Sequence, residues 1–196
     1  MNVRSGLYVL YVRGQVIGIQ WIGKGDVMEL EVEISELEKA HKRRCGRWLH
    51  IAAAESATGG RIGDRITNVP GASEYVVGGI IAYSNEAKQV LLGVSENTLR
   101  DFGAVSAEVA REMAAGARES LRADLCVSDT GIAGPGGGSL SKPVGLFYMG
   151  LATASECHVV QHLFEADREG NKEAAVSVAL TLIRDRLVQL VASEDQ

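Results

Sequence analysis

Three short segments of this chain carry side chains that can do chemistry. The first is residues 54–60 (AESATGG), where an apolar run ends at Ser56 and Thr58 before an amphipathic segment begins. The apolar run is typical of a buried strand, so Ser56 is expected just past the carboxyl end of a strand, where open α/β sheets bind ligands. The free N–H groups of the next helix, which follows Gly59 and Gly60, favour an anion or the oxyanion of an acyl-transfer intermediate. The alternative is an ordinary helix cap followed by flexible glycines.

The second segment, IIAYSNEAK, again runs from an apolar strand into a helix, with Ser84 or Asn85 as its cap. Tyr83 is expected at the end of the strand and Lys88 on the first helical turn. Both side-chain types can activate a serine hydroxyl without histidine if burial or a cationic neighbour lowers their pKa. Two other interpretations stay open: Lys88 is a solvated surface lysine, or it pairs locally with Ser84, four residues away on the same helix face.

The third segment, residues 127–138 (VSDTGIAGPGGG), is an apolar strand that opens into a loop with five glycines and one proline. Such a loop lets backbone N–H groups approach a ligand closely. It does not match a Walker loop, because no Gly-Lys-Ser/Thr closes it, nor a G-x-G-x-x-G turn that leads into a helix. Its composition fits a floppy surface loop and a phosphate-binding loop equally well.

Together these segments resemble the C-terminal domain of the competence-damage-inducible protein CinA, whose stand-alone members are nicotinamide-mononucleotide amidohydrolases (PncC). The family pattern reads approximately A-E-S-C-T-G-G, P-G-S-S-x-x-x-x-G, Y-S-N-E-A-K, L-G-V, G-A-V-S, T-G-I-A-G-P-G-G-G and K-P-V-G. This chain follows the pattern in order at residues 54–60, 70–79, 83–88, 92–94, 103–106, 130–138 and 142–145. The resemblance extends from about Ser35 to about Leu190.

The resemblance implies hydrolysis of the carboxamide of nicotinamide mononucleotide to nicotinic acid mononucleotide and ammonia, in pyridine nucleotide salvage. It makes Ser56 the nucleophile, with Tyr83 and Lys88 acting beside it. Amide hydrolysis needs a nucleophile, a proton acceptor that later protonates ammonia, and an oxyanion site, which the amides of residues 58–60 are expected to supply. The residues expected to bind substrate are Thr58, Gly59, Gly60, Thr130, Gly131, Ile132, Ala133, Gly134 and Arg168. No metal and no cofactor are expected.

The chain departs from the family pattern in two places. Ala57 replaces the cysteine after the serine, and the pattern G-D-R-E-x-x-R becomes residues 166–172 (ADREGNK). Arg168 keeps a guanidinium that can form a fork on a phosphate, whereas Lys172 offers only a point charge in place of the second arginine. The alternative function is therefore a non-catalytic nucleotide-binding or regulatory domain, although the combination of serine, tyrosine and lysine favours catalysis.

Composition limits the partners and the compartment. With 196 residues and 46% hydrophobic content, the chain is long enough for one domain with a full core. A net charge of -5 does not favour binding to the negatively charged DNA backbone. The three cysteines form no C-x-x-C pair, and no transmembrane span or signal peptide is found, so we expect reduced thiols, a cytoplasmic location, no membrane partner and a homo-oligomer. His158 and His162 are expected on one strand, roughly 13 Å apart, which is too far to share a metal ion.

Periodicity predicts a three-layer α/β/α domain with a mixed sheet over residues 35–196, after an N-terminal extension over residues 1–34. The extension holds two apolar runs, 7–12 and 15–22, in the pattern of a hairpin. It is far too short for the additional molybdopterin-binding-like domain of full-length CinA, so the second hydrolase activity of that domain is not expected. The predicted elements are helices over 36–44, after the cap Ser106 and over 169–191, and strands over 124–129, 144–153 and 156–164. The last helix should bury a stripe of Val176, Leu180, Ile183 and Leu187.

Overall fold

A five-stranded sheet forms the centre of the computed structural model, which describes residues 7–12, 15–21 and 30–193. The strands lie in the order β4-β3-β5-β6-β7. Strand β3 runs parallel to both of its neighbours, β4 and β5, whereas β6 runs antiparallel to both of its neighbours, β5 and β7. Their bounds are β3 Ile51–Glu55, β4 Val76–Ile81, β5 Leu125–Gly131, β6 Leu146–Ala152 and β7 Cys157–Leu163. The predicted mixed sheet is therefore confirmed.

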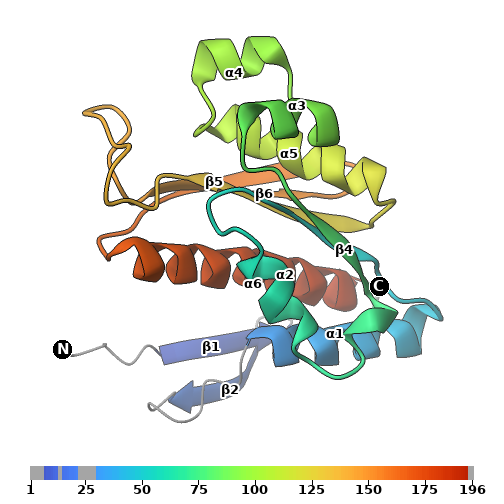
Figure 1. Cartoon of the computed structure of the whole chain (residues 1–196). Helices are drawn as coiled ribbons and strands as arrows, with labels where there is room; N and C mark the ends of the chain where they lie inside the picture. The colour runs from blue at the N-terminus through green and yellow to red at the C-terminus, as the bar shows by residue number, and fades with distance from the viewer. Residues whose placement is uncertain (1–6, 13–14, 22–29, 194–196) are drawn as a thin grey trace.

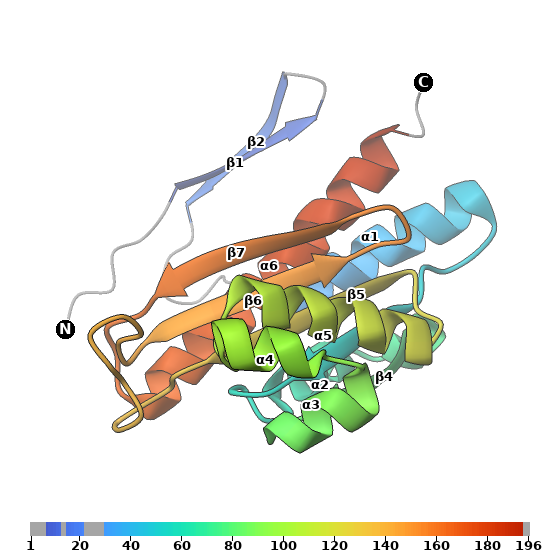
Figure 2. The same cartoon turned by 90° about the horizontal axis from the view of Figure 1, so that it is seen from above.

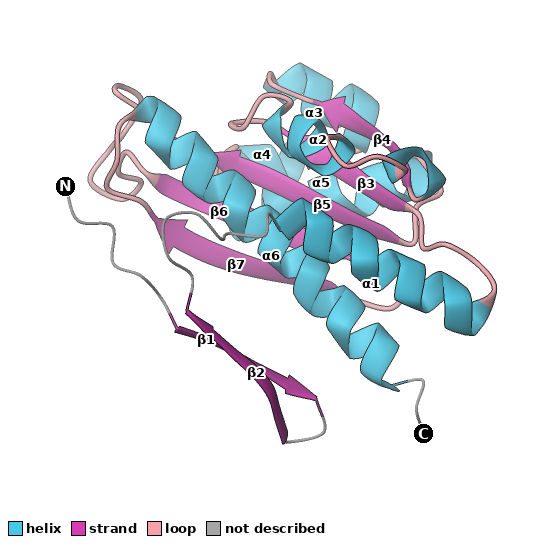
Figure 3. Ribbon diagram, turned by 90° about the horizontal axis from the view of Figure 1, so that it is seen from below, coloured by secondary structure: helices cyan, strands magenta, loops and turns pink. Residues whose placement is uncertain are grey.

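Helices cover both faces of this sheet. Figure 1 shows α1, α2 and α6 on one side of the strands and α3, α4 and α5 on the other. The views from above and from below show the same division (Figures 2 and 3). The helices are α1 Leu30–Cys45, α2 Arg61–Thr67, α3 Asn85–Leu92, α4 Glu96–Phe102, α5 Ala107–Ser120 and α6 Arg168–Ser193, with a short 3-10 turn over Ala72–Glu74. The three-layer α/β/α architecture follows directly.

The alternation of side chains along β3 divides the core in two. Ile51 and Ala53 pack with α1, α2 and α6, whereas Ala52 and Ala54 pack with α3 and α5. All five residues of β3 are buried, as expected for a central strand with helices on both sides. The four residues predicted as the core stripe of α6 are each 0% exposed: Val176, Leu180, Ile183 and Leu187. Ser106 caps α5 as predicted, because its Oγ accepts the N–H of Val109.

Among the boundaries that differ from the prediction, tertiary contacts explain the start of α1 and the end of β5. Helix α1 begins at Leu30 rather than at Glu36, because Ile34 is fully buried in the core and Glu31 forms an ion pair with Arg65 of α2. Strand β5 continues to Gly131 rather than ending at residue 129, because its last residues pair with β6. Gly131, a weak strand former, is kept in the strand by its pairing with Phe147 of β6.

The N-terminal runs form the predicted hairpin, in which β1 (Leu7–Val12) pairs antiparallel with β2 (Gln15–Trp21). Its turn, at residues 13–14, and residue 22 at its predicted end lie outside the described residues. Strand β7 carries both His158 and His162, as predicted. Among the helices described, none combines the length and the apolar character needed to cross a bilayer.

Candidate active site

Three parallel strands deliver the predicted site residues to one edge of the sheet. Strand β3 lies between β4 and β5, so its carboxyl end is a topological switch point, where α/β sheets open a crevice. A pocket of about 270 Å³ lies there. It is lined by Ser56, Ala57, Tyr83, Lys88, Ala104, Val105, Thr130, Gly131, Ile132, Ala133, Gly134, Gly136, Gly137 and Arg168. Residues from all three chemically interesting segments therefore meet in one place.

Ser56 and Lys88 form a buried pair at this pocket. The Nζ of Lys88 lies 2.9 Å from the Oγ of Ser56, and the two residues are only 2% and 7% exposed, respectively. Helix α3 positions the lysine, because Ser84 caps the helix by accepting the N–H of Ala87 and so places Lys88 on the first turn. The solvated lysine and the local pair with Ser84, which the sequence left open, are both excluded by this geometry.

The surroundings of Lys88 lower the affinity of its amine for a proton. Its Nζ also contacts the carbonyl oxygens of Ala82 and Tyr83, at 2.9 and 3.1 Å, and no ion pair to it is found among the described residues. Burial lowers the pKa of Lys88 from its usual value of 10.5, and the negative charge of Asp129 opposes this effect. A neutral amine can donate its two hydrogens to the two carbonyls, which leaves its lone pair directed at the Ser56 hydroxyl. This is the arrangement of a general base beside a nucleophile.

Glu55, the last residue of β3, caps the helix that follows the serine. Its carboxylate accepts the N–H groups of Gly60, Ile62 and Gly63 at 2.8 to 3.1 Å, and it is only 2% exposed. Helix α2 therefore already has an internal anion at its N-terminus, where the unpaired N–H groups and the positive end of the dipole lie. An anionic ligand does not have these donors available.

Asp129, near the end of β5, holds the turn that contains the nucleophile. Its carboxylate accepts the backbone N–H groups of Ser56, Ala57 and Thr58 at 3.0, 2.8 and 3.2 Å. The side chain is 0% exposed, and burial raises its pKa to about 6, with the hydrogen bond from the Thr58 hydroxyl opposing the shift and the charge of Glu55 adding to it. The backbone of the serine turn is thus fixed from the neighbouring strand.

These two carboxylates occupy two of the three N–H groups predicted for the oxyanion site. The N–H of Thr58 donates to Asp129 and that of Gly60 to Glu55, so neither is free to face a substrate. Thr58 is itself fully buried, and neither it nor Gly59 and Gly60 lines the pocket. The available donors lie on the opposite wall, in the glycine-rich loop. The backbone N–H groups there that make no hydrogen bond to a described residue are those of Ala133, Gly134, Gly136 and Gly137.

The glycine-rich loop is held in place by side chains from β5 and α6, so the floppy surface loop is excluded for its first half. The Thr130 hydroxyl donates to the carbonyl of Ala104, and the Asn171 amide on α6 donates to that of Ala133. Thr130 therefore anchors the loop instead of offering its hydroxyl to a ligand. Gly131 is required for packing, because a Cβ there would overlap the ring of Phe147.

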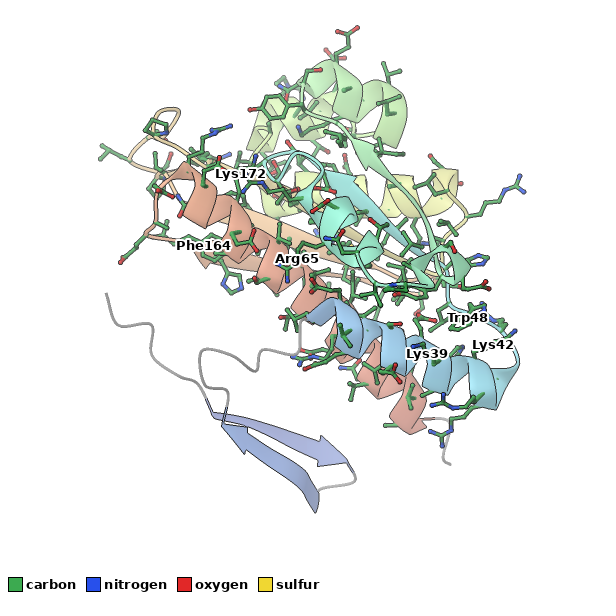
Figure 4. All side chains as sticks on the ribbon, turned by 60° about the horizontal axis from the view of Figure 1, so that its bottom comes forward. Lys39, Lys42, Trp48, Arg65, Phe164 and Lys172 are labelled. Carbon is green, nitrogen blue, oxygen red and sulfur yellow. The ribbon has the colours of Figure 1, made fainter. Side chains whose placement is uncertain are left out.

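Helix α6 brings positive charge to the pocket. Arg168 lines the pocket and donates one Nη hydrogen bond to the carbonyl of Gly134, at 2.7 Å. Lys172 lies one turn further along, and its Nζ would be 3.7 Å from a Cβ built on Gly59. In Figure 4 the Lys172 side chain extends from α6 toward the turn after β3. Tyr83 also lines the pocket, but it is 66% exposed and contributes only its backbone carbonyl to Lys88.

Sequence reasoning missed three residues of this arrangement. Glu55, Asp129 and Asn171 are all buried, and each accepts or donates hydrogen bonds that fix the pocket walls. The available signal was an acidic residue at the end of an otherwise apolar strand, since a buried carboxylate must have hydrogen-bond partners.

Comparison with known proteins identifies similar chains. A family model described as the CinA C-terminal domain matches residues 34–187. A CinA-like protein from Salinibacter ruber is 49% identical over 166 residues, covering 85% of this chain and 39% of the relative. A putative competence-damage inducible protein from Caldicellulosiruptor saccharolyticus is 51% identical over 140 residues, covering 71% of this chain and 34% of the relative. The chain thus spans less than half the length of these relatives.

Solved structures agree with the sequence comparisons. The crystal structure of competence/damage inducible protein CihA from Agrobacterium tumefaciens is 35% identical, with a TM-score of 0.69, and covers 85% of this chain and 96% of its own. A CinA superfamily protein from Escherichia coli is 29% identical, with a TM-score of 0.73, and covers 83% and 94% of the two chains.

Proposed function

Since the chain belongs to the CinA family by its C-terminal domain, we propose that it is an amidohydrolase that cleaves the carboxamide of nicotinamide mononucleotide. The observation that carries this proposal is the 2.9 Å contact between Lys88 Nζ and Ser56 Oγ at the floor of the pocket. A buried lysine without an ion-pair partner is costly to a fold, and a nucleophile that needs a base explains its presence.

The reaction uses the side chains in a defined order. Lys88 takes the proton of the Ser56 hydroxyl as its Oγ attacks the amide carbon, and the tetrahedral intermediate then collapses as Lys88 returns the proton to the departing ammonia. A water molecule, deprotonated by Lys88, hydrolyses the acyl-enzyme and frees nicotinic acid mononucleotide. The free N–H groups of the glycine-rich loop, at Ala133 and Gly134, are the proposed donors to the oxyanion.

Recognition of the nucleotide is assigned to the cationic wall of the pocket. Arg168 uses one nitrogen on Gly134 and keeps further N–H groups for a phosphate, and Lys172 adds a second positive charge nearby. Tyr83, exposed at the rim, offers a ring face to the nicotinamide or the ribose.

Ammonia release from nicotinamide mononucleotide tests the proposal. Ser56→Ala should lose activity by at least about 1000-fold while the fold is retained, because only a hydroxyl is removed. The exposed Ser120→Ala, at the end of α5, is the matched control and should keep full activity. Thr58→Ala is a further comparison, because the Thr58 hydroxyl is buried between two carboxylates and cannot reach a substrate. If Ser56→Ala remains active, Ser56 is not the nucleophile. If the native protein binds the nucleotide without releasing ammonia, the non-catalytic binding function replaces the hydrolase.

A further inference from the structure

The hydroxyl of Thr58 bridges two buried carboxyl groups directly behind the nucleophile. It lies 2.7 Å from an oxygen of Glu55 and also within hydrogen-bond distance of Asp129. Thr58 and Asp129 are both 0% exposed, and Glu55 is 2% exposed. Three polar side chains from the end of β3, the following turn and β5 therefore share one buried site.

The two contacts of the Thr58 hydroxyl depend on how many protons the three side chains carry. A hydroxyl has one hydrogen, so Thr58 can donate to only one of the two carboxylates. The second contact becomes a hydrogen bond only when the other carboxyl group carries a proton and donates it to the Thr58 oxygen. Two like charges in a buried site also push one carboxyl group toward its neutral form. The geometry therefore supports one proton shared through Thr58 between Glu55 and Asp129.

Asp129 is the better holder of this proton. Glu55 lies at the N-terminus of α2, where three backbone N–H groups donate to its carboxylate. Asp129 accepts three backbone N–H groups as well, but it is fully buried in the sheet, and burial raises its pKa to about 6. Asp129 therefore changes its charge within about one pH unit of neutrality.

The charge of Asp129 acts on Lys88. It is the ionic neighbour that favours the protonated form of the lysine, against the effect of burial. The other charged groups near the pocket are Glu55 behind the turn and Arg168 and Lys172 on α6, while α3 itself places no acid beside the amine.

We propose that Asp129 is a positioning residue for the catalytic pair: it fixes the backbone of the Ser56 turn, and through the proton it shares with Glu55 it controls how readily Lys88 becomes a base. This inference rests on the proposed hydrolase function for its kinetic consequence only. When Asp129 is neutral, Lys88 loses its proton more easily; when Asp129 is ionised, the lysine keeps it longer.

A lysine titration tests the proposal without substrate. Protein labelled with ¹³C at lysine Cε is titrated by NMR, and the Lys88 signal is assigned with Lys88→Met. In the native protein the signal should move in two steps, a small one between about pH 5 and 7 as Asp129 ionises and a larger one as Lys88 itself titrates. A single step would overturn the proposal.

Two variants at Thr58 identify the group responsible for the first step. Thr58→Val removes the hydrogen bond that lowers the pKa of Asp129, so the first step should move to higher pH. Thr58→Ser retains the hydroxyl and should leave the step where it is. A first step that is the same in the valine variant and the native protein would also overturn the proposal.

Asp129→Asn provides the kinetic test. The first step should disappear, the Lys88 titration should move down by about one pH unit, and kcat should fall at least about tenfold with KM little changed. Asp124→Asn is the matched control, because Asp124 also accepts a backbone N–H, from His50, but lies at the opposite end of β5.

If Asp129→Asn does not fold, the titrations of the native protein and of the Thr58 variants still decide whether Asp129 acts on Lys88. Two-step titration without any ammonia release would refute the hydrolase but not the role of Asp129, whereas ammonia release with one-step titration would refute only the latter.

Discussion

Replacement of Glu38 by glutamine should make the protein more stable at alkaline pH. Glu38 lies on α1, is 0% exposed, and uses one carboxyl oxygen to accept the N–H of Leu49. Its other oxygen has no hydrogen-bond partner among the described residues. Burial raises the pKa of Glu38 from 4.5 to about 7, with the hydrogen bond from Leu49 opposing the shift and the charge of Asp124 adding to it.

The linkage between protonation and folding gives the sign and the size of the change in the free energy of unfolding with pH. A carboxyl group whose pKa is higher in the folded state stabilises the fold fully below pH 4.5, and this contribution is lost as the pH rises through 7. Since each pKa unit corresponds to about 1.4 kcal/mol, the loss is about 3 kcal/mol, most of it between pH 5 and pH 8. Glutamine resembles the protonated acid and does not ionise, so Glu38→Gln avoids the loss.

Urea unfolding followed by circular dichroism at several pH values measures the effect. The free energy of unfolding of Glu38→Gln minus that of the native protein should increase by about 3 kcal/mol from pH 4.5 to pH 8. Asp129 contributes with the same sign but is present in both proteins and cancels. The control is Glu36→Gln on the same helix. Its exposed carboxylate has its pKa lowered by a hydrogen bond from Lys39, so the stability difference for this variant should not grow over this range. A difference for Glu38→Gln that stays constant with pH would refute the reasoning.

Three further predictions concern the site. The acid limb of the pH dependence of kcat/KM should lie below pH 10.5, because burial lowers the pKa of Lys88. Lys88→Met should remove this limb, and Lys88→Arg should not restore activity because the guanidinium stays protonated. An active arginine variant would mean that the side chain only stabilises charge. Arg168→Ala should raise KM at least about tenfold for nicotinamide mononucleotide and much less for the riboside, and equal effects measured on both substrates would exclude a phosphate contact. Gly131→Ala should lower the free energy of unfolding by about 2 kcal/mol or more, because the new methyl group overlaps the Phe147 ring; an unchanged urea midpoint would contradict the packing role.

Local patterns in the sequence were sufficient for the elements that carry the site. The apolar run before Ser56 and the helical stripe of α6 each depend on residues within one or two turns of each other, and both were predicted correctly. The cap of α3 was narrowed to Ser84 or Asn85, and the structure shows Ser84. The motifs also indicated which hydroxyl and which amine belong together, through a resemblance to one family.

Contacts between distant residues could not be predicted in this way. Lys88 and Ser56 are 32 positions apart, and Asp129 contacts the serine turn from 73 positions away. These distances close only because β3 lies between β4 and β5, which a single sequence does not specify.

Burial explains why two of the predicted oxyanion donors are already occupied. From the sequence, the N–H groups of Thr58 and Gly60 are free to bind a ligand, whereas in the fold they donate to Asp129 and Glu55. A buried backbone N–H must find an acceptor, and the sheet supplies a carboxylate before a substrate can. The sequence by itself determined which hydroxyl, amine and acid side chains the chain carries. The order of the strands decided that Lys88 lies beside Ser56 and that Asp129 accepts the N–H groups of the Ser56 turn.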